Sequence, residues 1–180
     1  HALALDSTLA SAHTALAMAG MHSWHWADAE VEHKRAIAVD PSDAAAHLQY
    51  GRFLWYRRRD AEARAEWLHA RELDPYSGVV SAWIALHLVN NGQDQEGLQE
   101  TRRAFELDSM SLVVSQMGSR IYLYAGRPRE AMRLAQGILG SPPPFVGMFA
   151  FVLGRAGDLA AARTMALDLV RSASRTWFAH

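Results

Sequence analysis

Packing residues recur at steps of three and four along most of the chain, and turn signals interrupt this pattern at regular intervals. In residues 44–57 the recurring positions share one face of a helix: His47, Tyr50, Gly51 and Leu54. Residues 61–74 have the same periodicity. Because a short polar stretch separates the two segments and Pro75 follows the second, we predict a unit of helix, turn, helix and stop.

The unit recurs with a constant length. An acidic residue ends each second segment, at equally spaced positions: Asp6, Asp40, Asp74 and Asp108. Pro142 occupies the next such position. Self-similarity at a period of roughly 20 to 50 residues is typical of solenoids, in which each helix pair buries its apolar face against its neighbours. The pattern therefore predicts an all-α chain built as an α-solenoid of about five stacked antiparallel helix pairs.

Small and large residues alternate on the packing faces of the two predicted helices of the second unit. Small residues let two helix backbones approach closely: Gly51, Ala63 and Ala70. Large residues fill the volume beside them: Tyr50, Leu54 and Trp67. We expect a tight antiparallel pair, with Asp60 as the N-cap of its second helix.

These positions resemble the tetratricopeptide repeat. The second unit matches that family's pattern through His47, Tyr50, Gly51, Leu54, Ala63, Trp67, Ala70 and Pro75. The first matches through His13, Leu16, Ala17, Ala29, Ala36 and Pro41, and the third through Ile84, Ala85, Gly92 and Ala104. The resemblance implies a right-handed superhelix, with repeats near residues 10–43, 44–77, 78–111, 112–143 and a shortened repeat at 144–174.

Both chain ends predict partial repeats. Residues 1–6 look like the tail of an earlier second helix, and residues 174–180 look like the start of a new element. We therefore expect residues 1–180 to form a single array within a longer protein. The first turn carries Trp24 and Trp26, which resembles arrays of bacterial multidomain signalling and transcription-regulating proteins. The alternative interpretation is that both tryptophans only staple this turn to the helices.

Composition narrows the functional classes. The chain is 50% hydrophobic and 21% charged, with a formal net charge of -1. Acidic and basic residues are mixed, so the sequence predicts no contact with nucleic acid. No apolar run approaches the ~18 residues that cross a bilayer, so we expect no membrane insertion. Cysteine is absent, which excludes a disulfide framework and thiolate metal sites. A cytoplasmic location is favoured over a periplasmic one, which also accommodates chains without cysteine.

Catalytic motifs are missing from the pattern. Paired carboxylates occur on second helices, whose outer face is normally charged and solvated: Glu30 with Glu32, Glu62 with Glu66, and Asp94 with Glu96. No glycine-rich phosphate loop follows a strand, and no serine lies in a nucleophile elbow. The sequence therefore predicts neither an enzyme nor a cofactor.

Histidines offer the main candidates for a metal site. His22, His25 and His33 could surround a zinc ion, but they have no cysteine partner, and His33 falls on a position that normally packs between helices. His13 and His47 occupy large packing positions, where a buried imidazole with a satisfied hydrogen bond is expected. We predict no metal site. A metal or small-ligand sensor centred on His22 and His25 is the alternative function.

Three consecutive cations, Arg57, Arg58 and Arg59, lie in the turn of the second unit. Acidic residues follow at Asp60 and Glu62, so an ion-paired, solvated turn is favoured over a site for a phosphate-bearing or acidic partner.

The resemblance implies a concave surface made by the first helix of each repeat. The groove positions are Met18, Met21, His22, Arg52, Trp55, Tyr56, Leu86, Val89, Asn90, Gln116, Arg120, Tyr124, Phe151 and Arg155. Aromatic residues and arginine are typical interface anchors. We therefore expect a noncatalytic scaffold that binds a protein or peptide segment of acidic and apolar character. The competing interpretation is that some of these side chains only cover neighbouring helices. Self-association into a homo-oligomer stays open.

Overall fold

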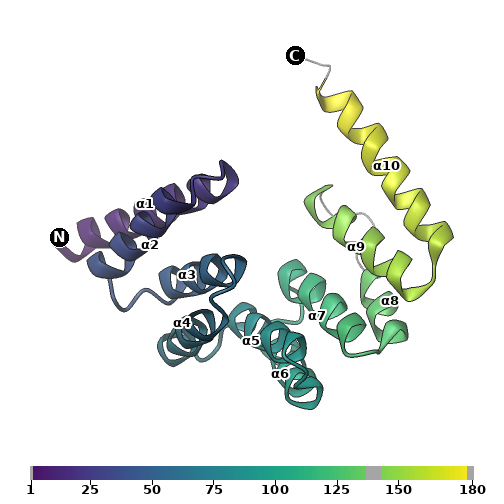
Figure 1. Cartoon of the computed structure of the whole chain (residues 1–180), viewed down its shortest axis with the longest axis horizontal. Helices are drawn as coiled ribbons and strands as arrows, with labels where there is room; N and C mark the ends of the chain where they lie inside the picture. The colour runs from purple at the N-terminus through teal and green to yellow at the C-terminus, as the bar shows by residue number, and fades with distance from the viewer. Residues whose placement is uncertain (1, 137–142, 178–180) are drawn as a thin grey trace. The chain divides into compact units, whose positions relative to one another are not determined.

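A computed structural model describes residues 2–136 and 143–177, in which every regular element is an α-helix (Figure 1). The helices are α1 (Ala2–His22), α2 (Trp26–Val39), α3 (Ala44–Tyr56), α4 (Asp60–Leu73), α5 (Gly78–Asn90), α6 (Asp94–Leu107), α7 (Leu112–Tyr124), α8 (Pro128–Gln136), α9 (Pro143–Ala156) and α10 (Leu159–Trp177). The predicted helix pair of the second unit, residues 44–57 and 61–74, is confirmed as α3 and α4, with bounds that differ by no more than a single position.

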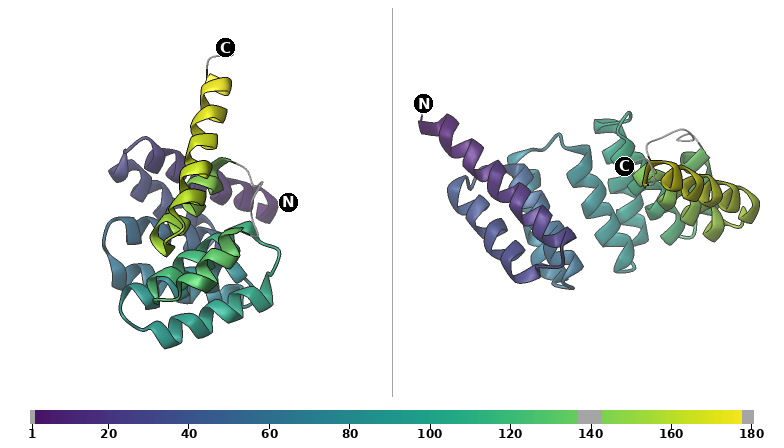
Figure 2. Two further views of the ribbon diagram at one scale, coloured as in Figure 1. Left: turned by 90° about the vertical axis from the view of Figure 1, so that its right-hand side faces the viewer. Right: turned by 90° about the horizontal axis from the view of Figure 1, so that it is seen from above.

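The chain divides into two compact units, residues 1–80 and 81–180, with the boundary inside α5. In the first unit α1 packs against α2 and α3 packs against α4, each as an antiparallel pair (Figures 1 and 2). Helix α3 also contacts α1 and α2. Neighbouring pairs thus share buried surface in this unit, as stacked repeats require.

The second unit continues the same order of contacts. Helix α7 packs against α6, α8 and α9, and α10 packs against α9. Small and aliphatic residues form part of the core here: Ala131, Ala135, Val152 and Leu153. Tyr122 and Met165 lie partly buried against that core.

The turns within the helix pairs repeat one backbone geometry. Each contains a residue of positive φ, and these are Trp24, Arg58, Gly92, Gly126 and Gly157. The first four are equally spaced along the chain, and Gly157 follows slightly sooner. The bounds of the shortened fifth repeat stay a prediction. In each turn an amide donates back to the preceding helix, such as His25 N–H to the Gly20 carbonyl at 2.9 Å.

The small and large positions of the second repeat pack as expected. A Cβ on Gly51 would lie only 2.6 Å from Trp67 Cδ1. The Trp67 ring is fully buried, and its Nε1–H donates to the Leu48 carbonyl at 3.3 Å. The close approach of α3 and α4 therefore depends on the missing side chain at Gly51.

Three local predictions are wrong. Helix α4 has Arg59 as its N-cap, and Asp60 is its first helical residue, where a carboxylate still favours the positive end of the helix dipole. Residues 2–6 belong to α1 rather than to an earlier helix: α1 runs through Asp6 and Ser7, where no proline forces a stop of the kind seen after Asp40 and Asp74. Residues 174–177 are the end of α10 rather than a new element, and 178–180 lie outside the described residues.

Candidate functional site

An open pocket of about 380 Å³ lies in the first unit, between the C-terminal end of α1, the α1–α2 turn and α3. We call it the turn pocket. Its lining residues are Met21, His22, Trp24, Trp26, Arg52 and Tyr56. The pocket exists because the repeat brings the ends of two successive first helices next to the turn that follows the first of them.

The two tryptophans of the turn have different roles. Trp26 is half-buried, and its ring centroid lies 6.1 Å from that of Phe53, so it does staple the turn to α3. Trp24 contacts Trp26 edge-on at 5.7 Å but remains 77% exposed. The interpretation of both residues as staples is therefore wrong for Trp24, because little of its surface packs against the protein.

The charged groups at the turn pocket are cationic. Arg52 is half-buried in its wall, and its Nη1 donates to Gln49 Oε1 at 2.6 Å. The guanidinium of Arg57 lies 5.8 Å from the centroid of the Trp26 ring. None of the six lining residues is acidic. This combination of aromatic rings and positive charge suits a group that is apolar in one part and negatively charged in another.

The predicted groove residues of the first unit lie partly in the turn pocket. Arg52 and Tyr56 line it, and Tyr56 is 49% exposed. Trp55 is half-buried beside Tyr56, with ring centroids 5.4 Å apart, and Met18 is half-buried on α1. Neither Trp55 nor Met18 belongs to the lining. Sequence reasoning placed Trp24 and Trp26 in the turn but did not predict that they enclose a pocket with α3.

The predicted groove residues of the second unit divide by exposure. Those with accessible side chains are Asn90, Gln116, Arg120, Tyr124, Phe151 and Arg155. The Arg120 guanidinium lies 5.9 Å from the Tyr124 ring centroid, which orders both side chains on α7. Leu86 and Val89 are buried in the core, so their assignment to a binding surface is wrong. For the accessible residues a binding role stays a prediction.

Two histidines form equivalent hydrogen bonds in successive repeats. His13 Nδ1 pairs with Glu32, and His47 Nδ1 pairs with Glu66 at 2.7 Å. His47 Nε2 also donates to the Pro41 carbonyl at 3.0 Å. The prediction of a buried histidine with a satisfied bond is confirmed for His47, whereas His13 is bonded but only partly buried. The solvated position expected for Glu32 and Glu66 is wrong, because both carboxylates are partly buried. The signal for these partners was that both members of the pair recur together, one repeat length further along the chain.

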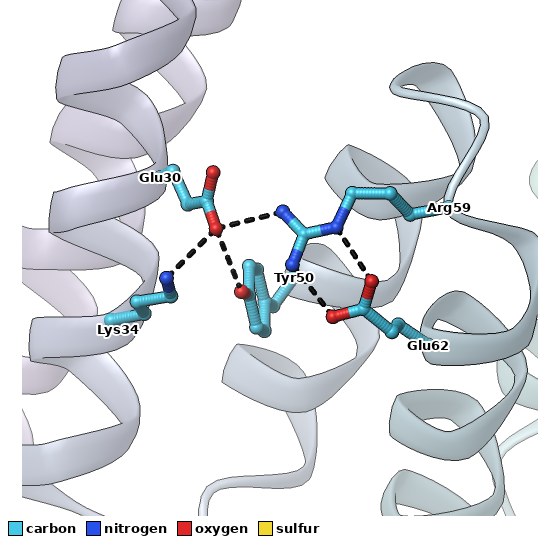
Figure 3. A network of polar contacts seen from close by, with 5 residues as sticks. All are labelled: Glu30, Lys34, Tyr50, Arg59 and Glu62. Carbon is cyan, nitrogen blue, oxygen red and sulfur yellow. Dashed lines mark hydrogen bonds and ion pairs between the residues drawn. The ribbon is translucent and has the colours of Figure 1, made fainter.

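A second polar network joins α2, α3 and the start of α4 (Figure 3). The Glu30 carboxylate accepts from Lys34 Nζ and Arg59 Nη1, each at 2.8 Å, and from the Tyr50 hydroxyl at 3.3 Å. Arg59 also forms a bidentate pair with Glu62, with bonds of 2.7 and 2.6 Å. The bonds from Arg59 first, and then from Lys34, lower the pKa of Glu30 to about 2, although burial acts in the opposite direction. The ion-paired interpretation of the arginine turn is confirmed for Arg59.

Glu30→Gln is expected to lower the free energy of unfolding at pH 7 by about 2 kcal/mol, because it removes a partly buried carboxylate from its cationic partners. A depressed native pKa stabilises the fold above the unfolded value of 4.5 and loses this effect as the pH falls towards 2. Urea unfolding from pH 7 to pH 2.5 should therefore show the difference between wild type and variant shrinking below pH 4.5.

Glu62→Gln is the matched control, since Glu62 shares the Arg59 guanidinium but is 57% exposed. Its effect at pH 7 should be clearly smaller. Equal losses in the two variants would contradict a stabilising role for the interhelical bonds of Glu30.

No group of three histidine, cysteine, aspartate or glutamate side chains within residues 2–136 and 143–177 is arranged to hold a metal ion. His22 Nδ1 donates to the Met18 carbonyl at 2.7 Å, and His33 lies inside the helix packing, away from the turn. These observations do not favour a metal sensor, and a small-ligand sensor at His22 and His25 stays a prediction. Among the helices that the structure describes, none has the length and apolar character to span a membrane.

Comparison with known proteins identifies the fold. No protein-family model and no curated protein sequence matches the chain. PilF of Pseudomonas aeruginosa superposes with a TM-score of 0.70 at 18% identity, over 93% of this chain and 77% of that protein. A tetratricopeptide repeat protein from Parabacteroides merdae gives 0.67 at 10% identity, over 90% and 64%. YrrB, described as a tetratricopeptide protein with an unusual peptide-binding site, gives 0.53 at 15% identity, over 88% and 84%. The predicted tetratricopeptide fold is therefore confirmed.

Proposed function

We propose that this chain is a noncatalytic interaction scaffold that binds a peptide segment of a partner protein on the exposed surface of its first helices. The observation that carries this proposal is the turn pocket, in which aromatic rings and a guanidinium lie open to solvent. Exposed aromatic and arginine side chains in a hollow are typical of interface anchors. The fold shared with YrrB, a protein described by its peptide-binding site, supports the same interpretation.

Two finer proposals accompany this one. The accessible residues of the second unit, among them Arg120 and Tyr124, contribute to partner binding. The tryptophan-bearing turn resembles those of bacterial signalling and transcription-regulating arrays, which supports a role as the regulatory segment of such a protein. Neither proposal requires a cofactor, a metal or a catalytic group.

Selection from a displayed library of random peptides tests the scaffold function. Wild-type protein is expected to enrich a set of sequences, and synthetic versions of these should bind in fluorescence anisotropy. The Arg52→Glu/Arg120→Glu variant should bind them at least tenfold more weakly, since charge reversal replaces attraction by repulsion. Its melting temperature should change little, because both side chains are only partly buried.

Arg64→Glu/Arg163→Glu is the control for this charge reversal. Both residues are exposed on second helices, α4 and α10, and the net change in charge is identical. The control should bind the selected peptides like wild type. Failure to enrich any peptide, or equal losses in both double variants, would contradict the proposed binding surface.

A further inference from the structure

We propose that the α1–α2 turn sets the specificity of this scaffold: the turn pocket takes an aromatic side chain of the bound peptide, and Arg52 pairs with the carboxylate of an adjacent aspartate or glutamate. The inference rests on the proposed function and adds the chemistry of the ligand. It also assigns Trp24, which sequence reasoning treated as a staple, to the binding surface.

The backbone at Trp24 is the first argument. The position has φ 62°, a left-handed conformation that a bulky side chain adopts at a cost. Three of the five equivalent turn positions carry glycine, namely Gly92, Gly126 and Gly157, and so avoid that cost. Packing does not explain a tryptophan here, because 77% of the residue is exposed. A strained residue whose side chain faces solvent in a pocket wall is better explained by a ligand.

The size and charge of the turn pocket identify the occupant. A space of about 380 Å³ accommodates one large side chain together with a short stretch of backbone. Trp24, Trp26 and Tyr56 offer ring faces and edges for an aromatic group. Arg52 supplies the donors for a carboxylate, and the lining contains no acid that would repel it. Arg52 and the nearby Arg57 would repel a cationic peptide.

Three capped peptides provide the test: acetyl-Gly-Asp-Phe-Asp-Gly-amide, a version with lysine in place of both aspartates, and a version with alanine in place of phenylalanine. Binding is followed by NMR through the indole N–H signal of Trp24, assigned by its loss in Trp24→Gly. The first peptide is expected to shift this signal. The lysine and alanine peptides should bind at least fivefold more weakly.

Two glycine variants separate the loss of a binding side chain from the relief of backbone strain at a residue of positive φ. Trp24→Gly and Arg58→Gly both place glycine at a turn residue of positive φ, 62° and 61°, so neither should lower the melting temperature. Trp24→Gly should weaken binding of the first peptide at least tenfold. Arg58→Gly should change the affinity for this peptide less than twofold. Equal affinity for wild type and Trp24→Gly would overturn the assignment of Trp24.

The remaining outcomes distinguish this inference from the proposed function. If library-selected peptides bind but the first peptide does not, the scaffold function stands and the ligand chemistry is wrong. If no peptide binds at all, both fail. N-acetylphenylalanine binding as tightly as the first peptide would identify a small-molecule site instead. Dimers of wild type that Trp24→Gly dissociates would identify a second copy of the chain as the occupant.

Discussion

Replacing His33 by phenylalanine is expected to stabilise the protein, and to stabilise it more at pH 5 than at pH 7. His33 is fully buried in α2, with ring centroids 5.6 Å from Tyr50 and 5.4 Å from Phe53. Neither ring nitrogen has a hydrogen-bond partner. An apolar ring in this place removes buried polar atoms that have no partners, a gain of about 1 kcal/mol at pH 7.

The pH dependence follows from the native pKa of His33. Burial first, and then the charge of Arg52, lower this pKa from 6.5 to about 4, although Glu30 acts in the opposite direction. Between these values the unfolded chain binds a proton that the native state does not, so stability falls as the pH falls from 6.5 to 4. From pH 7 to pH 5 the wild type should lose about 2 kcal/mol through this residue alone.

Urea unfolding of wild type and His33→Phe at pH 7, 6 and 5 measures the effect. The variant should gain about 1 kcal/mol at pH 7 and about 3 kcal/mol at pH 5 relative to wild type. His25→Gln, at an exposed histidine of the α1–α2 turn, is the control for the loss of a histidine side chain outside the core. A difference between His33→Phe and wild type that is constant over this range would contradict a buried neutral imidazole.

The repeat period predicted the fold because each repeat must satisfy the same packing. Helix pairs and the close approach at Gly51 follow from the positions of a few residues within a constant repeat frame. The N-terminal end was harder to predict, because the same Asp-Ser pair occurs in two different settings. Helix α1 runs through Asp6 and Ser7, whereas α6 ends just before Asp108 and Ser109.

The candidate site was predicted only in part, because a repeat position specifies a helix face but not its exposure. Arg52 and Tyr56 line the turn pocket from α3, where large and small residues distinguish the faces, and their role in binding stays a prediction. Helix α5 is apolar on most sides, so Leu86 and Val89 could not be separated from surface residues by periodicity. The exposure of Trp24 depends on the turn conformation, and the signal for that conformation is the glycine at the equivalent positions of later repeats, Gly92 and Gly126, rather than the tryptophan itself.

Gly51→Ala is expected to destabilise the protein by about 2 kcal/mol, although alanine is the better helix former. The added methyl group would overlap the Trp67 ring, with Cδ1 only 2.6 Å away. Trp67 cannot retreat easily, since its ring is fully buried and its indole N–H is bonded to the Leu48 carbonyl. Gly154→Ala is the control: its methyl group would lie 3.5 Å from Ala162 Cβ, an ordinary contact, so stability should hold or rise.

The equivalent positions in the next repeat indicate which second substitution would offset the loss of stability. In the next repeat the positions of Gly51 and Trp67 are held by Ala85 and Thr101, both buried, so a larger residue on the first helix accompanies a smaller one on the second. In a Trp67→Thr background, Gly51→Ala should therefore be neutral or slightly stabilising, although Trp67→Thr itself leaves a cavity. Chemical denaturation of the four proteins in this double-mutant cycle should give a coupling of about 2 kcal/mol. Additive effects would mean that the cost at Gly51 arises within α3 and not from its contact with α4.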